Sequence, residues 1–154
     1  MSGQAQAVPW ITFDVTKLTV TEPPPTLAPI TIIPRTGSFV LSAQFAIDYV
    51  FGKGLNDLSV GGLPVFQYEV SYFAESIGPG PEWSGSPPPV SCILGNYAYG
   101  APQTSLAVSA MSLAPGTYSI TCTVKMSPRG GSSGGSQFPV VGSVEGPMIE
   151  IYQP

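Results

Sequence analysis

Apolar and polar residues alternate along three segments of the chain, residues 39–51, 65–75 and 118–126. A period of two is that of a β-strand with one face buried, because successive side chains of a strand point to opposite sides. We therefore predict a strand in each segment. The positions expected to face the core are Phe39, Leu41, Ala43, Phe45, Ile47, Tyr49, Phe51, Phe66, Tyr68, Val70, Tyr72, Ala74, Tyr118, Ile120, Cys122, Val124 and Met126.

Shorter apolar segments predict further strands, and none of the chain sustains a helical period over ten residues. One stretch, residues 106–114, is also compatible with a short helix. The chain has 18 Gly and 18 Pro although 43% of its residues are hydrophobic, which is typical of many turns joining short strands. We predict an all-β fold, an antiparallel β-sandwich of about 8–9 strands with Ig-like or jelly-roll-like topology. The weaker strands are expected at residues 11–21, 31–33, 90–94, 105–113, 140–144 and 148–152.

The length of 154 residues suits one domain with a core of its own. We expect a single β-sandwich domain over residues 1–154, with an extended Pro-rich N-terminal arm over about residues 1–37. The Gly-rich residues 127–137 are expected to be a long hairpin loop. The Pro-rich residues 77–90 are expected to cross between strands, with Trp83 as a packing anchor.

Residues 113–124, LAPGTYSITCTV, contain a Pro-Gly turn that leads into Tyr118, with Cys122 inward on the same face. This stretch resembles the penultimate core strand of immunoglobulin-like sandwiches. The resemblance implies a sandwich that ends in a hairpin of residues 118–126 and 140–152. It carries no function, because one sandwich architecture serves many unrelated activities.

Only 9% of the residues are charged, and the net charge is −4. The five basic residues are scattered, so the sequence gives no electrostatic footprint for nucleic acid or anionic lipid. Residues 83–124 carry no charge, but their longest piece free of Gly and Pro, residues 103–114, is shorter than the roughly 20 residues of a membrane span. No signal peptide is visible. We expect cytoplasmic synthesis and assembly into a particle such as a virion, with extracellular display as an alternative.

The chain has no histidine, which excludes catalysis by histidine and ordinary zinc sites. Its two cysteines, Cys92 and Cys122, form no metal-binding or redox motif. We expect buried thiols, with a disulfide as the alternative. No phosphate-binding loop occurs, and we expect no cofactor and no metal.

The most ligand-like group is Trp83 with Glu82, Asn96, Tyr97 and Tyr99, since aromatic faces beside amide donors are typical of sugar-binding sandwiches. The competing interpretation makes Trp83 a cap on the sandwich and both tyrosines ordinary strand aromatics. A third hypothesis is a hydrolase whose catalytic carboxylates are paired across strands. The carboxylates available for such a pair are Glu75, Glu82, Glu145 and Glu150.

The uncharged run bears most directly on function, because sheets use charges, prolines or coverage to prevent their edges from pairing with other chains. Either Ser and Thr hydroxyls solvate residues 83–124, or another protein covers them. We therefore expect a non-enzymatic structural or assembly protein, a component or accessory subunit of a larger particle such as a phage virion, shell or filament. Its expected partners are other protein subunits, as a homo-oligomer or a larger assembly. The alternative is a carbohydrate-binding or adhesion module that uses exposed aromatics.

Overall fold

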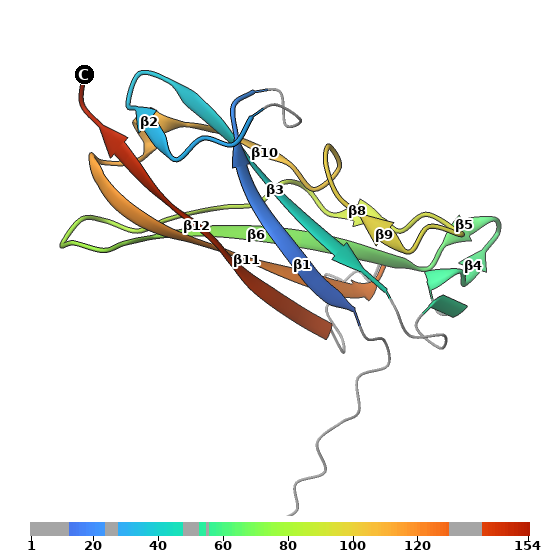
Figure 1. Cartoon of the computed structure of the whole chain (residues 1–154). Coiled ribbons are helices and arrows are strands. Elements are labelled where there is room, and N and C mark those ends of the chain that lie inside the picture. Colours follow the sequence, from blue (N-terminus) through green and yellow to red (C-terminus); the bar gives the residue numbers. More distant parts are fainter. Residues whose placement is uncertain (1–12, 24–27, 48–52, 55, 130–139) are drawn as a thin grey trace, which may run out of the picture.

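The computed structural model describes residues 13–23, 28–47, 53–54, 56–129 and 140–154. These form two antiparallel sheets packed as a sandwich, with a small hairpin at one end (Figure 1). The predicted all-β sandwich is confirmed. The elements are β1 (Asp14–Thr21), β2 (Ile32–Pro34), β3 (Ser38–Ala46), β4 (Ser59–Val60), β5 (Leu63–Pro64), β6 (Phe66–Ser76), β7 (Trp83–Gly85), β8 (Val90–Ser91), β9 (Ala98–Tyr99), β10 (Leu106–Ser109), the 3₁₀ turn η1 (Ala110–Ser112), β11 (Gly116–Pro128) and β12 (Val140–Tyr152).

The first sheet, here sheet A, has the order β1-β3-β10, and β9 also pairs with β3. The second, sheet B, has the order β2-β12-β11-β6-β7, and β8 pairs with β6 further along the strand. Among the described strands, β2 alone runs parallel to its neighbour, β12. The hairpin β4–β5 lies at the opposite end of the molecule from the C-terminus (Figure 1).

The three strongest strand predictions correspond to β3, β6 and β11. All their predicted core positions that the structure describes are buried; Tyr49 and Phe51 lie outside the described residues. On the other face of β3, Val40 and Ser42 are also buried. The reason is that β1 and β10 flank Val40 on both sides, and Ser105 closes over Ser42 with a hydrogen bond of 2.7 Å between the two hydroxyls.

Two weaker predictions change in detail. Residues 140–152 form one long strand, β12, instead of two. The pairing of β11 with β12 shifts register at Gly146 and Pro147, and this bulge accommodates a proline that has no N–H to donate. Within residues 105–113 the predicted strand forms as β10, and it runs directly into the three-residue 3₁₀ turn η1.

The hairpin of β11 and β12 is the one implied by the immunoglobulin-like resemblance. Tyr118 is buried at the start of β11, and its hydroxyl donates a hydrogen bond of 2.6 Å to the carbonyl of Ala114. A tyrosine bonded to the backbone a few residues upstream is the corner interaction of such sandwiches. It fixes the turn by which the chain leaves sheet A and enters sheet B.

Close contacts join the two sheets along both sides of the sandwich. On one side, β12 passes against β1: a Cβ at Gly142 would lie 3.0 Å from Phe13 and Val15, and one at Gly146 would lie 2.7 Å from Leu18. On the other side, a Cβ at Gly85 would lie 2.8 Å from the Trp83 ring and 3.1 Å from Leu106. Trp83 therefore packs over Gly85 beside β10 and belongs to the periphery of the core.

Residues 77–90, predicted to cross between strands, lead from β6 to β8, contain a short strand of their own, β7, and stay in sheet B. After the turn at residues 77–82, β7 pairs with β6 from Tyr72 to Ala74, and β8 then pairs with Gln67 and Tyr68. The stretch is the edge of sheet B, and its prolines leave that edge with few backbone donors. The chain crosses to sheet A only later, between β8 and β9.

The segment expected to be an N-terminal arm contains two sheet strands, β1 and β2. The described ends of residues 21–29 pair with each other, through a bridge between Thr21 and Pro29 and a hydrogen bond of 3.2 Å from Glu22 N to Ala28 O. In the described part of the chain, no helix has the length and hydropathy to cross a bilayer.

Candidate functional site

Sheet A is interrupted in the middle of β3. β10 pairs with β3 as far as Leu41 and β9 begins to pair at Phe45, which leaves the backbone of Ala43 without a strand partner on that side. Side chains replace the missing strand. The Ala43 N–H donates to the Tyr72 hydroxyl (2.9 Å), the Thr104 hydroxyl donates to the Ala43 carbonyl (2.7 Å), and the Tyr72 hydroxyl donates to the Thr104 carbonyl (2.5 Å). Sheet B thus holds the interrupted strand of sheet A from beneath.

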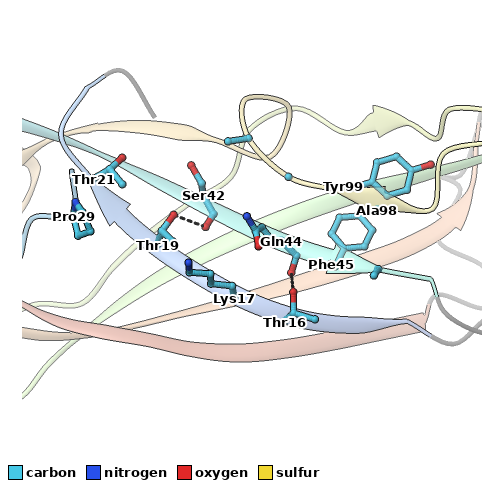
Figure 2. Close-up of a pocket in the computed structure, with 13 residues that line it drawn as sticks. Thr16, Lys17, Thr19, Thr21, Pro29, Ser42, Gln44, Phe45, Ala98 and Tyr99 are labelled. Atoms are coloured by element: carbon cyan, nitrogen blue, oxygen red, sulfur yellow. Dashed lines mark hydrogen bonds between the residues drawn. The ribbon is translucent and has the colours of Figure 1, made fainter. Parts of the chain in front are cut away.

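A groove of about 690 Å³ lies on the outer face of sheet A at this interruption (Figure 2). β1 and β3 form its floor, and the loop after β9 forms one wall. Its lining is mostly hydroxyl, amide and small apolar groups: Thr16, Lys17, Thr19, Thr21, Pro29, Ser42, Gln44, Phe45, Ala46, Ala98, Tyr99, Gly100 and Ala101.

Most hydroxyls of this groove are already bonded to the sheet. Thr16 donates to the Gln44 carbonyl and Thr19 donates to the Ser42 carbonyl, each at 3.3 Å. Thr21 differs, because it is buried and its hydroxyl has no partner among the described residues. The groove therefore exposes the Gln44 amide to a ligand, whereas the Thr21 hydroxyl is closed off from solvent. None of its described lining residues is a carboxylate, and the charged side chain among them is that of Lys17.

The ligand-like tyrosines predicted from the sequence form part of an internal network. Tyr99 is buried, its ring lies 5.0 Å from that of Tyr68, and its hydroxyl donates to the side-chain oxygen of Asn56 (2.9 Å). Asn56 is fully buried and donates to the carbonyls of Ile93 (3.2 Å) and Asn96 (3.0 Å). These bonds fasten the loop between β8 and β9 to the helical turn before β4, so the polar groups of Tyr99 and Asn56 are not free for a ligand.

Tyr97 takes part in the same fastening. Its hydroxyl donates a short hydrogen bond to Asp57, and the N–H of Gly95 donates to the same carboxylate at 2.7 Å. The bond from Tyr97, followed by that from Gly95, lowers the pKa of Asp57, and Asp57 raises the pKa of Tyr97 in turn. The Lys53 ammonium lies 5.4 Å from the centre of the Tyr97 ring, at cation–π range.

Trp83 lies apart from this network. It pairs with Ala74 on β6, whereas Tyr99 contacts Tyr68 on the same strand. Six residues of a strand span about 20 Å. The structure therefore brings Asn96, Tyr97 and Tyr99 together but places Trp83 and Glu82 at a second location.

Glu82 joins Glu75 in a hollow of about 510 Å³ on the outer face of sheet B, lined also by Phe73, Ser84 and Thr121. Because Trp83 pairs with Ala74, Glu82 comes opposite Glu75 on the neighbouring strand. Both side chains are exposed, so the hollow lacks the apolar enclosure that a catalytic carboxylic acid requires. What it offers is negative charge beside an exposed aromatic ring.

The cysteines are both free and buried. The N–H of Cys92 bonds to Phe66 at one end of β6, and Cys122 pairs with Tyr72 six residues further along. About 20 Å of strand separates them, far more than a disulfide spans. Burial raises the pKa of each thiol to about 11. Across the described residues, His, Cys, Asp and Glu form no group of three or more that could hold a metal ion.

Sequence reasoning missed Asn56 and Thr104, which organise the two polar networks, and Thr21, whose buried hydroxyl has no partner among the described residues. Each is an isolated polar residue in a segment without strong periodicity, so no local signal could have identified it. No protein-family model matches the chain, and no curated protein is significantly similar to it.

Proposed function

We propose that this protein is a non-enzymatic structural subunit that acts by assembly with other protein subunits, as a component or accessory subunit of a larger particle such as a phage virion, a shell or a filament. The observation that carries the proposal is an exposed apolar surface at the β4–β5 end of the sandwich, which we call the apolar tip. Its members are Leu58, Val60, Leu63, Ile93 and Leu94, and their side chains are 42–75% exposed.

The apolar tip is held in a defined shape. β4 and β5 form a hairpin whose turn has two glycines with positive φ, Gly61 and Gly62. The Leu58 carbonyl accepts a hydrogen bond from Val65 N (3.0 Å), and the Asn56 side chain donates one to the Ile93 carbonyl. Asn56 thus connects the loop that carries Ile93 and Leu94 to the segment that leads into the β4–β5 hairpin. Five side chains exposed to this extent make a patch of a few hundred Å², about the size at which apolar surfaces of soluble proteins become functional.

The described charges next to the tip balance, since Lys53 and Asp57 carry one charge of each sign and both contact Tyr97. Two copies can therefore meet tip to tip without like-charge repulsion, and a two-fold contact needs only one self-complementary patch. The patch is smaller than the roughly 800 Å² per partner of a standard interface. We expect homotypic association that depends on protein concentration.

Sedimentation velocity and native mass spectrometry over a wide concentration range test the proposal. The double variant Val60→Thr/Leu63→Thr keeps β-branched or strand-compatible side chains but makes the tip polar, and it should stay monomeric at concentrations where the unaltered protein associates. Val141→Thr is the matched control, because Val141 is 59% exposed on β12, which β11 separates from β6. A protein that remains a monodisperse monomer at every concentration would contradict the homotypic contact.

A further inference from the structure

The outer face of sheet B carries large apolar side chains that the described residues do not cover. Ile32 on β2, Met148 on β12 and Phe73 on β6 are 60%, 53% and 39% exposed. Ile77, at the end of β6, is 59% exposed, and its N–H bonds to the Thr117 carbonyl. These side chains occupy neighbouring rows of one half of the sheet. We call this half of the outer face the acidic half-face, because carboxylates lie between its apolar side chains.

The strand register interleaves carboxylates with these apolar groups. One row runs from Ile32 through Glu150 to Thr117, and the next from Met148 through Ser119 to Glu75. The third row contains Glu145, Thr121, Phe73 and Ser84. Glu82 adds a fourth carboxylate opposite Glu75, in the hollow beside Phe73.

No basic residue occupies these rows. The base that β11 contributes to this face, Lys125, pairs with Glu69 of β6 and lies four residues beyond Thr121. Arg35, just after β2, donates its backbone N–H to Tyr152 at the rim. Within the described residues, none of the four carboxylates Glu75, Glu82, Glu145 and Glu150 has an ion-pair partner.

The sign of the charge selects the partner. Two copies meeting through this half-face would bring four carboxylates against four, which opposes a two-fold contact. Phosphate groups of nucleic acid or anionic lipid are repelled for the same reason. Exposed apolar side chains beside carboxylates instead match a protein surface that presents Arg or Lys around apolar side chains, and Arg fits best because its planar fork binds a carboxylate with two hydrogen bonds.

We propose that the acidic half-face of sheet B docks a basic, apolar surface of a different protein, with an apolar side chain against Phe73 and Met148 and guanidinium groups on Glu75, Glu82, Glu145 and Glu150. This inference rests on the proposed function as an assembly subunit. It names a second, heterotypic contact that is separate from the apolar tip.

The test uses two synthetic twelve-residue peptides as probes, one alternating Arg with Leu and the other alternating Glu with Leu. Each is titrated into the ¹⁵N-labelled full chain and followed by amide chemical shifts and by isothermal calorimetry. The Arg-Leu peptide should shift amides of Ile32, Phe73, Thr121 and Met148, and the Glu-Leu peptide should not bind. Sodium chloride should weaken the binding, because exposed charges are screened.

Variants that replace carboxylates by amides test the contribution of charge to this binding. The triple variant Glu75→Gln/Glu145→Gln/Glu150→Gln removes three exposed charges without changing side-chain shape, and it should weaken the Arg-Leu peptide about tenfold, since exposed pairs contribute a few-fold each. Glu69→Gln is the matched control on the same face and should leave affinity within about twofold, because Lys125 already faces Glu69.

Equal binding of both peptides, shifts confined to other surfaces, or an unchanged affinity in the triple variant would each overturn the docking surface. The two proposals fail separately. A monomeric protein that still binds the Arg-Leu peptide contradicts only the homotypic tip contact, whereas an associating protein that ignores the peptide contradicts only the acidic half-face.

Discussion

Tyr72→Phe tests whether side chains replace the missing strand of sheet A. The variant keeps the buried ring but removes the hydroxyl that accepts from Ala43 N and donates to the Thr104 carbonyl. It leaves both backbone groups unsatisfied in the interior, and each such group costs about 1–3 kcal/mol. We expect the free energy of unfolding to fall by about 2–5 kcal/mol, which lowers Tm by roughly 5–20 °C for a chain of this size.

The same strand supplies a matched control. Tyr68 is as buried as Tyr72 and faces the same core, but its hydroxyl has no hydrogen-bond partner among the described residues. Tyr68→Phe removes a buried unsatisfied group, so it should be neutral or stabilising. Both variants are compared by urea denaturation with the m-value checked for constancy.

A double-mutant cycle completes the experiment. Thr104→Val removes the second side chain that bonds to Ala43, and its effect should couple with that of Tyr72→Phe by more than about 0.5 kcal/mol because the two share partners. A Tyr72→Phe variant as stable as the unaltered protein, or a loss equal to that of Tyr68→Phe, would refute this account of the interrupted strand.

Three further predictions follow from the packing. Gly146→Ala should destabilise the fold by about 1–3 kcal/mol in a thermal melt, because the new Cβ would lie 2.7 Å from Leu18. Gly54→Ala is the control and should not destabilise the fold, because its new Cβ would have no heavy atom within 4 Å. Tyr118→Phe should cost about 0.5–1.5 kcal/mol in urea denaturation by removing the bond to Ala114, and a larger loss would mean that the corner does more than fix one turn. Burial raises the pKa of Cys92 and Cys122 to about 11 and that of Tyr68 to about 12, so the folded state retains protons that the unfolded chain releases at high pH. The free energy of unfolding should therefore be flat near neutral pH and fall as the pH rises above about 9. A rise in that range would contradict the burial of these three side chains.

The sequence predicts those parts of the fold in which one strand face is apolar over many residues. β6 and β11 are recognisable because polar residues alternate with buried ones, and both lie inside sheet B with neighbours on each side. Edge elements were less predictable. The three-residue β7 has no periodicity of its own, and its place is set by pairing with β6 and by Trp83 packing over Gly85.

The candidate surfaces were predictable only in part. Composition indicated Trp83, Tyr97 and Tyr99, but their separation depends on where β7 and β9 pair, which is a long-range property. The placement of Glu82 opposite Glu75, and of Met148 and Phe73 in neighbouring rows of one face, likewise depends on strand register. The strand order and register that bring these residues together cannot be read from one sequence alone.

The two proposed contacts should respond in opposite ways to salt. The apolar tip has balanced charges and aliphatic side chains, so added salt screens no net attraction there, and excluded salts such as sulfate strengthen apolar burial. The acidic half-face attracts its partner through exposed carboxylates, whose reach falls from about 10 Å at 0.1 M ionic strength to about 3 Å at 1 M. Sodium sulfate should therefore promote self-association while it releases the Arg-Leu peptide. A single protein sample followed by sedimentation and amide shifts across one salt series can show both effects, and parallel changes in the two would mean that a single surface serves both contacts.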